Sequence, residues 1–183
     1  MPRIEIELSP VDHITTDAIG AKGKRVFYLQ GTKGVQVVTL IAEKFQIQAL
    51  AAGVEQFLVE VAERFPDLPE ASPEYNEDEM RIIPPVDPLF RLANIGLGYS
   101  VEEDWVILVV HELTPENIEV AEDGPAEEPG VVRFFCTRDQ LRALGRWGVE
   151  SAQRGRPICT QCGQPEEPEG HFCVKKNGGH KHD

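Results

Sequence analysis

Apolar and polar residues alternate in several short segments near the start of the chain. Residues 4–8 read Ile-Glu-Ile-Glu-Leu, which is the two-residue period of a strand with one solvent-exposed face. Residues 25–30 and 35–42 are rich in β-forming residues, and the turn between them contains two glycines. This arrangement predicts a hairpin after the opening strand.

The apolar positions then recur at spacings of three and four residues, as they do in a helix with one buried face. This pattern covers residues 44–64 and ends before Pro66, which cannot continue a helix. A second helix is predicted over 138–154, where Thr137 is suited to the N-cap and Gln140 to closing a capping box. Two helices are therefore expected.

Three further strands are predicted in the second half of the chain. Residues 89–99 and 105–113 have the pattern of a second hairpin. The nearly unbroken apolar run of 105–113 favours a central strand with both faces covered. Residues 131–136 form the last predicted strand, which leads directly into the second helix.

The two strand-to-helix segments are similar to each other. Residues 37–50 and 131–144 align without a gap and share five identical residues, among them Gln46 and Gln140. Any strand that enters a helix repeats its apolar positions, but burial does not explain a shared glutamine. The alignment therefore favours an internal duplication.

The predicted fold class is α+β. Residues 1–156 would form one domain from two β-β-β-α halves, 1–65 and 89–154, with acidic connections at 66–88 and 114–130. An antiparallel sheet with both helices packed on one face satisfies this pattern.

The composition restricts the possible partners. The 183 residues include 31 acidic and 18 basic side chains, which gives a formal net charge of −13. Binding to duplex nucleic acid needs a net basic face, so this charge argues against free nucleic acid as a partner. No apolar run approaches the roughly 20 residues of a membrane span, and the first ten residues lack the apolar core of a signal peptide. We therefore expect a soluble cytoplasmic protein without membrane contact.

The charge is unevenly distributed along the chain. Residues 66–130 contain 17 acidic and 2 basic residues, whereas residues 131–183 contain 9 basic and 6 acidic residues. Most of the acidic residues lie in the two proline-rich connections. We interpret these connections as solvated surface segments rather than as an acidic docking surface.

Three of the four cysteines lie in the tail, residues 157–183, in the segments CTQCG and GHFC. Two thiolates in a CxxCG turn can bind one Zn²⁺, which prefers four nitrogen or sulfur ligands in a tetrahedron. The predicted ligands are Cys159, Cys162, His171 and Cys173, and His180 could replace the histidine. Four protein ligands leave no open position for water, so the predicted role of Zn²⁺ is structural.

A cluster of arginines is the second candidate site. Arg138, Arg142 and Arg146 recur every fourth residue along the second predicted helix, and Arg133 precedes them. Such a cluster could bind the phosphate of a small molecule. The competing interpretation is that these arginines pair with the acidic residues of 66–130, and we favour this interpretation.

Five segments carry a resemblance to a known family. They are SPVDHITTDAIG (9–20), YLQG (28–31), FRLANIGLGY (90–99), RDQLRALG (138–145) and the closing pattern RPxCxxCGxPxxPxGHxC (156–173). Together they resemble an uncharacterised bacterial family, a domain of unknown function of about this length. In that family GHxC recurs as a unit, which implies His171 rather than His180 as the zinc ligand. The resemblance implies a fold and a zinc site but no reaction.

The sequence contains no Gly-rich phosphate loop, GxSxG elbow or HExxH motif. We therefore expect a non-catalytic zinc-binding protein, an adaptor or binding module for a protein partner. One alternative is an enzyme or binding protein for a phosphorylated or nucleotide-like small molecule, which the four arginines would bind. A second alternative is nucleic-acid binding through the knuckle and the arginine helix.

Overall fold

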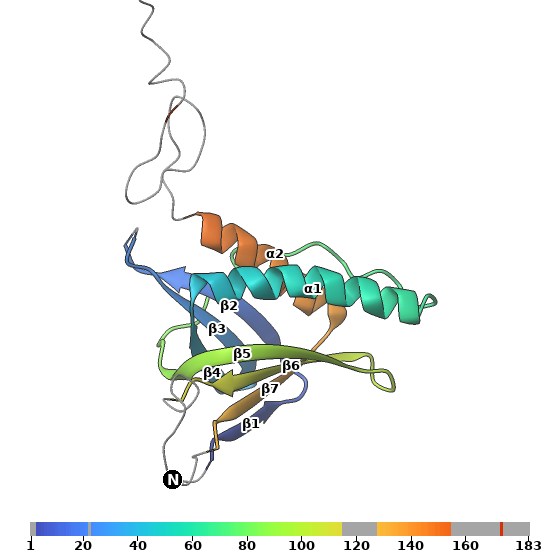
Figure 1. Cartoon of the computed structure of the whole chain (residues 1–183), viewed down its shortest axis with the longest axis horizontal. Helices are drawn as coiled ribbons and strands as arrows, with labels where there is room; N and C mark the ends of the chain where they lie inside the picture. The colour runs from blue at the N-terminus through green and yellow to red at the C-terminus, as the bar shows by residue number, and fades with distance from the viewer. Residues whose placement is uncertain (1–2, 22, 115–127, 155–172, 174–183) are drawn as a thin grey trace, which may run out of the picture.

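The computed structural model describes residues 3–21, 23–114, 128–154 and 173. In this part of the chain, seven strands form one curved sheet and two helices lie side by side over one face of it (Figure 1). The elements in chain order are β1 (Glu5–Leu8), β2 (His13–Ile19), β3 (Val26–Lys33), β4 (Gln36–Ala42), α1 (Lys44–Arg64), β5 (Pro88–Ser100), β6 (Trp105–Glu112), β7 (Val131–Cys136) and α2 (Arg138–Gln153). The predicted α+β class is confirmed.

The sheet is mixed, so the prediction of an antiparallel sheet was wrong in part. The strand order is β1-β7-β6-β5-β4-β3-β2, in which β1 is parallel to β7 and β4 is parallel to β5. The other neighbouring pairs are antiparallel. The parallel pair β4–β5 arises because the segment after α1 carries the chain back from the far end of the helix to the start of β5, which completes a crossover connection.

The two halves of the sheet have the same topology. The antiparallel strands β2-β3-β4 lead into α1, and the antiparallel strands β5-β6-β7 lead into α2. In the first half, β2 takes the place that the prediction gave to the opening strand. Residues 13–19 were not predicted as a strand, because Thr15, Thr16 and Asp17 are buried polar residues that interrupt the apolar alternation.

The shared glutamine has the same role in both halves. Gln46 Oε1 accepts a hydrogen bond from the backbone N–H of Glu43, and its Nε2 donates to the carbonyl oxygen of Ala93 at 3.0 Å. Gln140 Oε1 accepts from Thr137 N–H, and its Nε2 donates to the carbonyl oxygen of Asp12 at 3.2 Å. Each glutamine thus caps its own helix and links it to a neighbouring segment. That the two halves arose by duplication remains a prediction.

The sheet curls until its two edges approach each other. Residues 9–12 connect β1 at one edge to β2 at the other, with hydrogen bonds from Val11 N–H to β7 and from Asp12 N–H to β3. Across the interior, Gly31 of β3 lies so close to Phe134 of β7 that a Cβ at position 31 would be 2.5 Å from Cδ1 of the ring. The core lies inside this curved sheet and beneath the helices.

The core is formed by aliphatic and aromatic side chains from both layers. Its fully buried members include Leu8, Leu29, Leu40, Ile47, Leu92, Leu108, Phe134, Leu141 and Leu144. The prediction that both faces of β6 are covered was wrong for one of the two faces. Val106, Leu108 and Val110 are buried, but the residues that alternate with them are half-buried.

The acidic side chains of the first connection, 66–88, are exposed, as expected for a solvated segment, but the connection also packs against the domain at several points. Ala71, Met80 and Ile82 are buried. Gln30 Nε2 donates to the carbonyl oxygen of Ile83 at 3.1 Å, and Gln30 Oε1 accepts from the backbone N–H of Ile83 at 2.8 Å. Buried polar side chains of the sheet therefore satisfy the backbone of this segment.

For the second connection, residues 115–127 lie outside the described part of the chain. Neither of the two described helices is both long enough and apolar enough to cross a membrane.

Candidate functional site

The predicted zinc ligands lie almost entirely outside the described residues. Cys159, Cys162, His171 and His180 are not among them, and Cys173 is described, with 3% of its surface exposed. The residues that the structure describes contain no cluster of three or more histidine, cysteine or acidic side chains that could bind a metal ion. Zinc binding by the tail therefore remains a prediction.

Cys136, at the end of β7, is fully buried. Burial raises the pKa of its thiol to about 12. A thiol that stays protonated in the core is a poor nucleophile, so Cys136 serves as a small buried side chain.

Arg138, the first residue of α2, binds the acidic turn between β5 and β6. Its Nε and Nη2 donate to the two carboxylate oxygens of Asp104 at 2.8 and 3.1 Å, and its Nη1 donates to the carbonyl oxygen of Pro69 at 2.6 Å. These hydrogen bonds lower the pKa of Asp104. The guanidinium group is largely buried and engages partners from two different connections.

Arg142, one turn further along α2, is bound in a similar way. It pairs with Glu55 of α1 at 3.1 Å and with Glu70 at 3.2 Å, and it donates to the carbonyl oxygen of Ala71 at 2.6 Å. Arg146 approaches the same Glu55 at 3.9 Å.

Arg133 does not join this cluster. It extends from β7 and pairs with Glu5 of β1 at 2.7 Å. The four arginines predicted as an anion site therefore lie in two separate places, and each has a carboxylate partner. Arg133 and Arg146 pair with Glu5 and Glu55, outside residues 66–130. Arg138 and Arg142 pair with acidic residues of 66–130, as the interpretation that we preferred from the sequence expects. Their structural effect is to fix the first acidic connection and the β5–β6 turn onto α2.

The two helices differ in how closely they approach the sheet. On α2, a Cβ at Gly148 would lie 3.0 Å from Ile47 and 3.3 Å from Thr16, and a Cβ at Gly145 would lie 3.2 Å from Val54. These glycines let α2 pack tightly on α1 and β2. On α1, by contrast, a Cβ at Gly53 would meet no atom within 4 Å.

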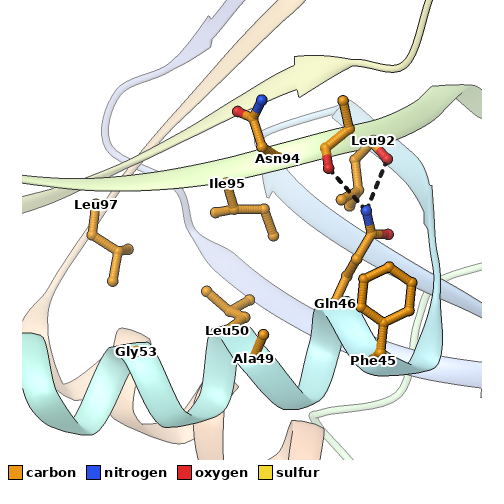
Figure 2. Close-up of a pocket in the computed structure, with 10 residues that line it drawn as sticks. Phe45, Gln46, Ala49, Leu50, Gly53, Leu92, Asn94, Ile95 and Leu97 are labelled. Atoms are coloured by element: carbon orange, nitrogen blue, oxygen red, sulfur yellow. Dashed lines mark hydrogen bonds between the residues drawn. The ribbon is translucent and has the colours of Figure 1, made fainter. Parts of the chain in front are cut away.

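The open space beside Gly53 is a cavity of about 230 Å³ between α1 and β5 (Figure 2). Leu50 points up from α1, Ile95 and Leu97 point down from β5, and Asn94 points away from the helix (Figure 2). The full lining is Phe45, Gln46, Ala49, Leu50 and Gly53 from α1, with Leu92, Ala93, Asn94, Ile95 and Leu97 from β5.

One end of this cavity is closed by a polar contact. Gln46 Nε2 donates to the carbonyl oxygens of Leu92 and Ala93 at 3.2 and 3.0 Å (Figure 2). Beside it stands Phe45, which has 67% of its surface exposed although it is a large aromatic residue. Its ring extends the apolar lining of the cavity to the protein surface.

A second hollow of about 700 Å³ continues from the cavity toward the end of α1. The two share Leu97, and the second is lined on the helix side mainly by Phe57, Glu60, Glu63 and Arg64. On the strand side it is lined by Leu97, Gly98, Tyr99 and Val101. We refer to the cavity and this hollow together as the α1–β5 groove.

The two parts of the α1–β5 groove differ in their chemistry. Its cavity is lined by aliphatic, aromatic and amide side chains, none of which is a nucleophile or a general base. The carboxylates and the guanidinium group lie in the second hollow. Sequence reasoning missed this groove, although Gly53 in the middle of a predicted helix was a signal that could have pointed to it.

Comparison with known proteins gives one match. The family described as "Protein of unknown function (DUF3090)" matches residues 6–173 of the chain. Neither a curated protein nor a solved structure matches this chain. Because the match covers far more than half of the chain, as the resemblance of the five sequence segments implied, this protein belongs to the DUF3090 family of proteins of unknown function.

Proposed function

We propose that this protein is a non-catalytic adaptor whose recognition site is the α1–β5 groove. The observation that carries the proposal is the difference between the two helices. α2 is packed against β2 and α1 through Gly145 and Gly148, whereas α1 leaves an apolar cavity against β5. Binding sites are typically concave and mostly apolar, with a few polar groups that orient the ligand.

The glycine in the wall of the groove supports this proposal. Glycine in a helix interior costs about 1 kcal/mol relative to alanine. At Gly145 and Gly148 close packing against neighbouring residues offsets that cost. At Gly53 no neighbouring atom would exclude a larger side chain, so packing does not explain the glycine. The space beside Gly53 is accounted for if a ligand occupies it.

We also propose that Zn²⁺ fixes the tail through Cys159, Cys162, His171 and Cys173. In support, Cys173 is almost completely buried. Yet the only large apolar side chains in residues 157–183 are Ile158, Phe172 and Val174. A closed metal site supplies order that so few apolar side chains cannot provide. Thiolate ligands of this kind persist in a reducing compartment, so we place the protein in the cytoplasm.

The groove is tested with the fluorescent apolar probe anilinonaphthalenesulfonate (ANS) and two matched tryptophan variants. Ala49 lines the cavity, whereas Ala52 is exposed on the same helix and does not line it. Wild type and Ala52→Trp are expected to enhance ANS fluorescence on direct excitation, and Ala49→Trp is expected to lose most of the enhancement. No enhancement in wild type, or equal enhancement in both variants, would refute groove binding.

The zinc site is tested by elemental analysis of protein purified without chelators. We expect one zinc per chain in wild type and in Cys136→Ala, and loss of the metal in Cys159→Ser. A chelator should remove the zinc without changing the far-UV circular dichroism of the sheet and helices. Absence of stoichiometric zinc from the wild type would end the zinc proposal and leave the groove proposal in place.

A further inference from the structure

β5 has different strand partners along its length. β4 pairs with it near its beginning, where Thr39 is opposite Pro88 and Ile41 is opposite Arg91. β6 pairs with it from Leu92 to Ser100. β4 ends at Ala42 and the chain turns into α1, so residues 94–100 of β5 have no strand partner on the α1 side among the described elements.

The α1–β5 groove is bordered by the open edge of β5 as well as by one of its faces. Successive side chains of a strand point to opposite faces, so a surface formed by one face is lined by alternate residues. Here residues 92–95 all line the cavity, and residues 97–99 all line the second hollow. Asn94 lines the cavity although its side chain points away from α1 (Figure 2), so the backbone edge of β5 borders the groove beside the face that carries Ile95 and Leu97.

Gln46 shows that backbone groups at this edge accept hydrogen bonds from the α1 side. Its side-chain amide donates to the carbonyl oxygens of Leu92 and Ala93, where the register of β5 shifts between Leu92 and Asn94. Beyond Ala93 the edge continues past Gly96 and Gly98. A Cβ at either glycine would meet nothing nearer than 3.9 Å. Glycines in a strand often mark a place where another backbone approaches closely.

We propose that an extended segment of a partner protein binds the α1–β5 groove by adding as a strand to residues 94–100 of β5. This inference rests on the proposed function and names the ligand. A polypeptide backbone can satisfy the N–H and C=O groups of an open edge, which an apolar small molecule cannot do. Residues 94–100 span roughly 24 Å, at about 3.4 Å per residue, which accommodates a peptide of about seven residues.

The groove also specifies the side chains of this segment. Because a bound strand would direct alternate residues toward the cavity, those residues should be aliphatic. The second hollow contains the carboxylates of Glu60 and Glu63 and the single guanidinium of Arg64, and the whole chain carries a net charge of −13. A basic residue is therefore expected at that end of the bound segment.

The test begins with a phage-displayed library of random peptides selected on the full-length, zinc-loaded protein. We expect selected peptides to alternate aliphatic residues and to carry Lys or Arg at one end. On binding of a synthetic selected peptide, hydrogen–deuterium exchange should slow at the backbone amides of residues 94–100. Methylating alternate amide nitrogens of the peptide should weaken binding about tenfold or more, because each methyl group removes a hydrogen bond to the edge.

The same tryptophan variants give a matched control. Ala49→Trp should weaken peptide binding about tenfold or more, whereas Ala52→Trp should leave it within about twofold of wild type. Peptide binding that leaves exchange at residues 94–100 unchanged would overturn strand addition.

Two further outcomes would also overturn strand addition, and they separate it from the proposed function. If ANS binds the groove but no peptide is selected, the groove is a site for an apolar small molecule and the proposed function survives. If the amides of residues 94–100 become protected with rising protein concentration alone, the occupant is a second copy of this chain.

Discussion

Replacing Gly53 with alanine is expected to make the protein more stable. Gly53 lies in the interior of α1, and a Cβ at this position would meet no atom within 4 Å. The substitution therefore introduces no steric cost, and it lowers the backbone entropy of the unfolded chain. The expected gain in the free energy of unfolding is about 0.8–1.0 kcal/mol, the difference in helix propensity between glycine and alanine.

This gain is measurable by urea unfolding followed by far-UV circular dichroism. For a chain of this size, about 1 kcal/mol corresponds to a rise in Tm of about 2–4 °C. Gly148→Ala is the matched control, because it makes the same change in α2, where the new Cβ would lie 3.0 Å from Ile47 and 3.3 Å from Thr16. Crowding there should offset the propensity gain by about 1 kcal/mol or more, so Gly148→Ala should be the less stable variant.

Two results would contradict this reasoning. Destabilisation by Gly53→Ala would show that α1 and β5 close around position 53 in solution. Equal stability of the Gly53 and Gly148 variants would show that the two helices pack alike. If the groove is open and functional, Gly53→Ala should also reduce ANS fluorescence, because the added methyl group enters the cavity. A stability gain would then accompany a loss of binding, as is common at functional sites.

The remaining predictions concern the core, an ion pair and a thiol. Gly31→Ala should lower the free energy of unfolding by about 1–3 kcal/mol, because its Cβ would lie 2.5 Å from Cδ1 of Phe134. Urea unfolding of this variant with Phe134→Leu added should show partial recovery, and a fully additive loss would contradict the proposed clash. Arg138 lowers the pKa of Asp104 in the folded state. The pair therefore stabilises the protein fully above the unfolded-state pKa of Asp, which is about 4. This stabilisation is lost as the pH falls through the folded-state pKa. The stability difference between wild type and Asp104→Asn, measured by urea unfolding, should therefore shrink below about pH 4, and a pH-independent difference would argue against the pair. Cys136, whose thiol pKa burial raises to about 12, should react with iodoacetamide at about pH 8 only after urea unfolding, as peptide mass spectrometry can show. Labelling of the folded protein at this cysteine would contradict its burial.

Features that depend on neighbouring residues could be predicted from the sequence. α1 occupies residues 44–64, as the spacing of its apolar residues and the position of Pro66 indicated. The capping box of Thr137 and Gln140 is present at the start of α2. These signals are local because a helix satisfies its backbone within a few residues and needs a cap at its own end.

Features that depend on strand pairing could not be predicted in the same way. β2 was missed because its threonines are buried through hydrogen bonds to distant backbone groups, such as the one from Thr15 to the carbonyl oxygen of Met80 at 2.6 Å. The parallel directions of β1 and β5 were also missed. Periodicity identifies a strand and its buried face but does not indicate the direction of its neighbour.

The amino-acid sequence by itself determined the α+β class, both helices, the cap of α2, and the residues that could pair or bind zinc. Only the tertiary structure decided that arginines such as Arg138 and Arg142 pair with carboxylates and fix the connection at residues 66–88. It also decided that an open strand edge and an apolar groove lie between α1 and β5. The physical reason is that capping and periodicity act over a few residues. Groove width and edge pairing, by contrast, are set by contacts between elements far apart in the chain, such as Gly148 against Ile47.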